Sequence, residues 1–136
     1  MQPDLKALLH YKNDKIVAHF CYHHPEISFL EAKILFTDLM GWMWLKAKRA
    51  SLNKKTYLFG PLLVLDKMWH TFILHTRDYI DFSMVYFGEY FHHEVEPAGL
   101  EHHIEESELA DYLDDCFNHL QQEWVERRFS DAFIDL

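Results

Sequence analysis

The stretch LDKMWHTFILHTRDYIDFSMVYFG, residues 65–88, decides the fold of this chain. Its apolar residues recur at helical spacing, which predicts one long helix from about Asp66 to Phe87. Gly88 follows at the position where a glycine in the left-handed conformation commonly ends a helix. At this spacing a dense aromatic group is more typical of a core than of a ligand pocket. Its members are Trp69, Phe72, Tyr79, Phe82, Tyr86, Phe87, Tyr90 and Phe91.

The chain before this stretch carries helix signals of its own. Asn13-Asp14 either breaks the first helical region or caps a second piece of it, and Pro25 ends it. Ser28-x-x-Glu31 fits a capping box, in which the serine hydroxyl accepts from a backbone N–H and the carboxylate reaches back. The helix that starts there closes with cations, which suit the negative end of its dipole: Lys46, Lys48 and Arg49.

The whole sequence is organised as helices joined by short links. It contains only four Gly and four Pro, which argues against an all-β chain with many tight turns. The expected helices cover residues 5–24, 28–49, 65–87 and 107–129, with a loop over 50–61 and an irregular, acidic, His-rich connection over 88–106. We therefore expect an all-α fold, an irregular bundle of four to five helices that forms a single domain over residues 1–136.

The cysteines and the apolar segments indicate a cellular compartment. Cys21 and Cys116 fall in apolar helical patterns and are expected to be buried free thiols, as in a reducing environment. The most apolar window, residues 34–45, is too short to span a bilayer and contains Asp38, so no membrane partner is expected. The N-terminus lacks the apolar run of a Sec signal. We expect a cytoplasmic location, with export by a non-classical route left open.

Charge is distributed unevenly along the chain. Residues 1–60 carry nine Lys/Arg and five Asp/Glu, a net of +4, whereas residues 61–136 carry four and seventeen, a net of −13. No Lys or Arg occurs between Arg77 and Arg127. Such a region repels phosphate backbones and attracts basic partners, although a solvated face is the alternative. We expect no nucleic-acid partner, and the basic helix end described above is assigned to the helix dipole.

This acidic region suggests binding to another protein. A partner with a basic surface is expected, such as an enzyme that the chain inhibits by occupying its basic groove. A homodimer is a further option, because so many aromatic residues leave scope for an exposed apolar patch. The carboxylates expected to carry the contact are Glu101, Glu105, Glu106, Glu108 and Asp111.

Eleven histidines raise the alternative of a metal site. Asp66 and His70 are four residues apart and share a helix face, whereas His70 and His75 are about 140° apart on a regular helix. After a turn at Gly88, one of His92 or His93 can return to His70, because neighbours in an extended segment point opposite ways. Asp66, His70, His92 and His93 are thus the candidate metal ligands, for Zn or Fe. The structural alternative is that Asp66 caps the helix and satisfies a core His70.

The same stretch resembles a known family. The pattern D-x-x-W-H-x-x-I-L-x-T-x-x-Y-x-x-F from Asp66 to Phe82, followed by F-G and His92-His93, resembles bacterial proteins related to the plant glycine-rich domain-containing protein-like family. The resemblance implies no reaction and no catalytic residues. It implies one structural or binding cluster, made of Asp66, Trp69, His70, Tyr79, His92 and His93. Ser83 departs from it, since related bacterial chains often carry Cys there, and this weakens any thiolate ligand.

Two hypotheses from different classes follow from the sequence. The first, which we favour, is a small acidic interaction module without catalytic activity that binds, inhibits or regulates a partner. No Ser-His-Asp, Cys-His or phosphate-cradling glycine pattern stands out. The second is an enzyme or sensor that uses the Asp/His cluster to hold a metal ion. Metal content of the purified protein separates the two.

Overall fold

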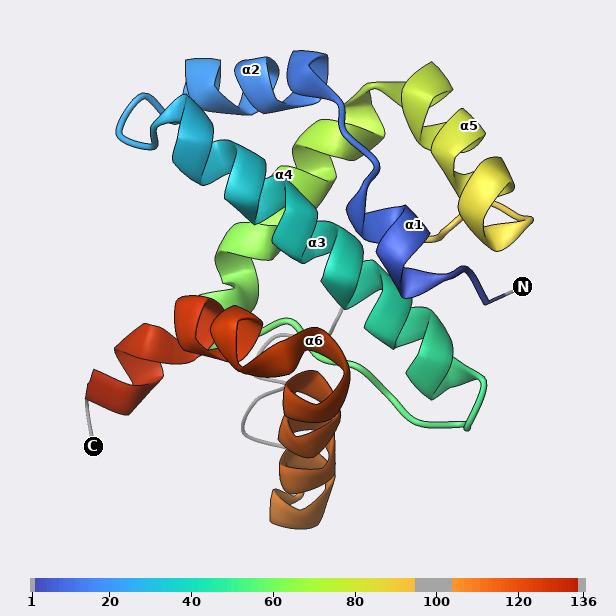
Figure 1. Cartoon of the computed structure of the whole chain (residues 1–136), viewed down its shortest axis with the longest axis vertical. Coiled ribbons are helices and arrows are strands. Elements are labelled where there is room, and N and C mark those ends of the chain that lie inside the picture. Colours follow the sequence, from blue (N-terminus) through green and yellow to red (C-terminus); the bar gives the residue numbers. More distant parts are fainter. Residues whose placement is uncertain (1, 95–103, 135–136) are drawn as a thin grey trace.

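The computed structural model describes residues 2–94 and 104–134, with side chains described up to Phe129. Within these ranges the regular structure consists of α-helices and one short 3-10 turn, and no strand occurs. The expected all-α irregular bundle is therefore confirmed (Figure 1). It contains more helices than the four to five expected, because two predicted helices are each divided. No helix in the described part of the chain is long and apolar enough to cross a membrane.

The first predicted helical region is two helices. Helix α1 spans Leu5–Leu9 and α2 spans Asp14–His23. Asn13 caps α2 by accepting from the backbone N–H of Ile16, so the Asn13-Asp14 signal marks a cap rather than a continuous helix. Both helices pack on α3.

Helix α3, Phe29–Ala50, runs through the middle of the molecule (Figure 1). It begins where the capping box predicts, since the Ser28 hydroxyl oxygen accepts from the Glu31 N–H at 3.1 Å. The Glu31 carboxylate in turn accepts from that hydroxyl at 3.0 Å. Much of the core comes from α3, including the fully buried Phe36 and Trp42. Packing of α1, α2, α4 and α6 around it makes α3 the central support of the fold.

The predicted helix from Asp66 to Phe87 is wrong in one respect: it is broken at His75. A 3-10 turn at Gly60–Leu62 leads into α4, Leu63–Leu74, and α5 covers Thr76–Phe87. In an unbroken helix, Trp69 and Tyr79 would lie about 15 Å apart along the axis. The break instead lets Trp69 Nε1 donate to the Tyr79 hydroxyl at 2.8 Å. Neither Gly nor Pro marks this bend, because tertiary packing of α5 against α4 produces it.

The last helix, α6, spans Glu106–Ile134 and is longer than predicted. It contains a kink at Gln121, whose φ of 74° and ψ of 167° lie outside helical geometry. Figure 1 shows two differently directed parts on either side of the kink. A non-glycine residue in this region of φ/ψ space is strained, so packing on both sides must hold it. Tyr112 and Cys116 are buried before the kink, and Trp124 after it.

The aromatic group of the decisive stretch lies mainly in the core, as predicted. Trp69, Phe72 and Tyr79 are almost wholly buried, and the Phe72 and Tyr79 rings meet edge to face at 4.9 Å. Tyr90 is the exposed member of the group. The predicted loop over 50–61 is also present up to the 3-10 turn. Part of the irregular connection predicted over 88–106 lies outside the described residues.

Candidate metal centre

The site begins on the first two turns of α4. Asp66 lies in the first turn, and His70 follows it on the same helix face. Asp66 Oδ2 is 3.4 Å from His70 Nε2, as the i, i+4 spacing predicts. The Asp66 side chain is 25% exposed and that of His70 is 58% exposed. Both groups are therefore reachable from solvent, so neither is locked in the core.

The third member arrives from the segment after α5. Gly88 ends α5 with a φ of 74°, a left-handed conformation that glycine adopts without strain. The chain then turns back, and His93 Nε2 comes to 2.6 Å from Asp66 Oδ1 and 3.1 Å from His70 Nε2. The His93 side chain is 18% exposed. Asp66, His70 and His93 offer one ligand atom each, all within 4.8 Å of one another.

His92 lies outside this cluster. Its side chain is exposed, and its ring contacts that of Tyr90 at 4.9 Å between centroids. Of the two adjacent histidines, only His93 faces Asp66, as expected for neighbours in an extended segment. His75 also lies elsewhere, because its Nε2 meets His19 Nδ1 of α2 at 2.8 Å.

A buried pair of aromatic side chains holds the returning segment in place. The Tyr79 hydroxyl donates to the backbone carbonyl of Phe91 at 2.5 Å and accepts from Trp69 Nε1. Burial raises the pKa of Tyr79, so the phenol keeps its proton and remains a donor. The Trp69 ring also packs against the His93 ring, with centroids 4.1 Å apart. The motif residues Trp69 and Tyr79 thus fix the position of His93, a role that their spacing alone does not reveal.

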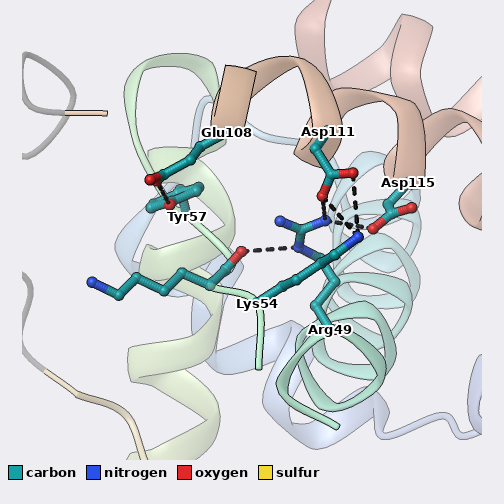
Figure 2. A network of polar contacts seen from close by, with 7 residues as sticks. Arg49, Lys54, Tyr57, Glu108, Asp111 and Asp115 are labelled. Carbon is teal, nitrogen blue, oxygen red and sulfur yellow. Dashed lines mark hydrogen bonds and ion pairs between the residues drawn. The ribbon is translucent and has the colours of Figure 1, made fainter. Parts of the chain in front are cut away.

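The five acidic residues predicted to bind a partner have different environments. Glu105 and Glu106 are exposed. Glu108 accepts from the Tyr57 hydroxyl at 2.8 Å, and Asp111 forms ion pairs with Arg49 and Lys54 (Figure 2). These two carboxylates therefore already have partners within the same chain. Glu101 lies outside the described residues, as does the His102-His103 pair.

Arg49 is not a surface cation, although it ends α3 in a basic cluster. Its side chain is only 3% exposed and pairs with both Asp111 and Asp115 of α6. Its Nε donates to the Lys55 carbonyl at 2.9 Å, and the guanidinium lies over the Tyr112 ring. Arg49 therefore serves the fold by joining α3, the following loop and α6.

The thiols offer no ligand to the cluster. Cys21 and Cys116 are both free, as predicted, but the predicted burial holds only for Cys116, because Cys21 is partly exposed. Cys116 is fully buried in the core, and burial raises its pKa to about 12, so it stays protonated at neutral pH. Ser83 is also fully buried. The candidate centre therefore consists of two imidazoles and one carboxylate.

Comparison with known proteins identifies the family of this chain. No curated protein and no solved structure matches the chain. The family model described as UCP032817-like matches residues 6–123, which include α1 to α5, the whole candidate centre and the first part of α6. The resemblance to relatives of the glycine-rich domain-containing protein-like family stays a prediction. Because the match covers far more than half of the sequence, this chain belongs to the UCP032817-like family.

Proposed function

We propose that this protein binds one divalent transition-metal ion, zinc or ferrous iron, through Asp66, His70 and His93. The observation that carries the proposal is the convergence of two imidazole nitrogens and a carboxylate from separate segments on one point. Imidazole and carboxylate are ligands that suit both ions. Because the cluster is partly exposed, burial in the core does not explain why these three groups meet.

The distances in the cluster support a metal ion. Tetrahedral ligands bound at about 2.0–2.1 Å from zinc lie roughly 3.3 Å from one another. The His70–His93 nitrogen distance of 3.1 Å and the Asp66–His70 distance of 3.4 Å are close to that value. The Asp66–His93 distance of 2.6 Å is that of a hydrogen bond. It has to widen by about 0.7 Å when a metal ion replaces the shared proton.

The number of ligands bears on what the ion does. Structural zinc sites are closed by four protein ligands, whereas catalytic sites keep a position for water or substrate. The three ligands named here leave at least one position open, and the exposed His70 edge gives access to it. We infer that the bound ion carries a water molecule or a small ligand. This fits an enzyme or a sensor better than a purely structural ion.

Calorimetric titration with zinc, and anaerobically with ferrous iron, tests the proposal. The chain is purified without a polyhistidine tag, because a tag would add to the weak background of metal binding by the eleven native histidines. We expect one site per chain in the wild type. His70→Ala and His93→Ala each remove a ligand and should weaken binding by more than the 10–100-fold that altering a supporting group costs. His92→Ala is the matched control, since it removes an exposed neighbour outside the cluster.

The outcomes are distinct. A wild type that binds neither ion stoichiometrically would overturn the proposal. Equal loss in His92→Ala and His93→Ala would show that the binding is diffuse. The favoured sequence hypothesis of a basic protein partner stays a prediction, and it now rests on exposed carboxylates such as Glu105 and Glu106.

A further inference from the structure

A second candidate site is a cavity whose wall contains three cationic side chains. The cavity has a volume of about 320 Å³ and is lined by residues of the α1–α2 link, α3 and α6. This is at the small end of the range for ligand sites. Its walls are formed by Lys12, Lys33, Ile34, Thr37, Asp38 and Arg127.

The single carboxylate in the wall is already neutralised. Asp38 is almost wholly buried and accepts two hydrogen bonds from Arg127, at 2.9 Å from Nε and 2.6 Å from Nη2. Arg128 Nε lies 3.0 Å from the same carboxylate and forms an ion pair with it. Two cations therefore face one anion, which leaves a surplus positive charge beside the cavity.

Two lysines add to this surplus. Lys12 Nζ donates to the Leu9 carbonyl and to Thr37 Oγ1, which places the ammonium and leaves its third N–H for a ligand. Lys33 is half exposed, and its nearest carboxylate, on Asp14, is 4.0 Å away. These four cations face three carboxylates, Asp14, Asp38 and Glu123, the last of which interacts with Arg127, so a net of one positive charge remains around the cavity.

The ligand must be a small molecule rather than a polyanion. The whole chain carries a net charge of −9, so an extended phosphate backbone is repelled over most of its surface. A small anion inside the cavity feels chiefly the local cations, because the Debye length is about 8 Å at physiological salt.

The arrangement of donors favours phosphate over a carboxylate. Arg127 keeps unused guanidinium N–H groups after its two bonds to Asp38, and Lys12 and Lys33 approach from other segments. Donors from several directions match a tetrahedral oxyanion, which carries oxygens on several sides. We propose that this cavity binds the phosphate group of a small molecule, independently of the metal centre.

An NMR titration of the ¹⁵N-labelled chain with inorganic phosphate tests the proposal, at constant ionic strength and about pH 7.5, where a phosphate is largely dianionic. We expect saturable shifts of the amides of Lys12, Ile34 and Thr37. Lys12→Gln and Lys33→Gln should each weaken binding by about tenfold or more, since each removes a charged donor. Lys67→Gln, an exposed lysine on α4, is the matched control. Arg127 is left unchanged, because its loss would strip Asp38 of a partner.

Each result decides the question. Shifts confined to the cavity and lost in the two lysine variants, but kept in Lys67→Gln, would support the site. No saturation with phosphate, or equal affinity in all variants, would overturn it. Succinate serves as a second ligand, and equal binding of this dicarboxylate would overturn the phosphate assignment. The metal proposal is untouched by any of these outcomes, because none of the cavity residues belongs to the cluster.

Discussion

Two polar clusters in this molecule are both built from distant segments, yet their contacts differ in kind. The Arg49 group is enclosed: its guanidinium is 3% exposed and bonds to two carboxylates and a carbonyl (Figure 2). The Asp66–His70–His93 cluster is partly exposed. Its three ligand atoms lie close to one another, within 4.8 Å.

The difference distinguishes a structural role from the ligand site proposed above. A buried charge costs free energy unless it is paired and hydrogen-bonded, and Arg49 pairs with two carboxylates and bonds to a carbonyl of the same chain. In the histidine cluster, two ring nitrogens face each other at 3.1 Å. His93 Nε2 also lies 2.6 Å from Asp66 Oδ1, so its single proton can serve only one of these two contacts, which supports the metal ion proposed above.

The largest expected effect breaks the enclosed cluster. Arg49→Met removes the guanidinium and leaves Asp115 beside α3 without its buried partner. Breaking a fully buried pair costs about 3–5 kcal/mol, and because Asp115 is 22% exposed the loss should be at most of this size, which thermal or urea unfolding measures. Lys54→Met is the control: it removes a half-exposed partner of Asp111 and should cost less than about 1 kcal/mol. Similar losses in both variants would show that Arg49 does not join α3 to α6.

A smaller effect concerns the support of the open cluster. Tyr79→Phe keeps the buried ring but removes the hydrogen bond to the Phe91 carbonyl, so the segment that carries His93 is held less firmly. We expect metal affinity to fall about tenfold, as for other supporting groups around metal ligands. Tyr90→Phe, an exposed ring on the same segment, is the control for titration. If Tyr79→Phe bound metal like the wild type, His93 would be positioned by ring packing alone.

The smallest effect tests a third polar contact, the His19–His75 pair at the bend between α4 and α5. Burial lowers the pKa of His75 below its ordinary 6.5, helped by His19 and Lys15, while Asp78 opposes the shift. The unfolded chain therefore takes up a proton at His75 before the folded chain does. Stability should fall as pH drops through about 6.5 and level off below the lowered pKa.

This pH effect is measured as the change of Tm between neutral and mildly acidic solution. His75→Gln cannot titrate and should lose less stability on acidification than the wild type. His92→Gln removes an exposed histidine that belongs neither to the His19–His75 pair nor to the Asp66–His70–His93 cluster. Its change of Tm on acidification should match that of the wild type. Should His75→Gln and the wild type respond alike, the bend would carry no proton-linked stability.

Local signals in the sequence predicted much of the helical scaffold and the grouping of Asp66 and His70 with one of His92 or His93. The cap at Ser28 and the end at Gly88 rest on backbone groups a few residues away, so a short window contains their cause. Asp66 and His70 share a face for the same reason, because helical spacing is a local property. The return of one histidine of the 92–93 pair followed from the turn at Gly88 together with alternation in an extended segment.

What only the tertiary structure decided depends on contacts between distant segments. His93 rather than His92 reaches Asp66, because the Tyr79 hydroxyl fixes the Phe91 carbonyl. The bend at His75 and the kink at Gln121 carry no Gly or Pro and are produced by packing. The sequence assigns Arg49 to the dipole at the end of its helix, whereas the structure shows it buried and paired with Asp111 and Asp115 of α6. Periodicity and caps are local, whereas burial and pairing are set by which helices meet.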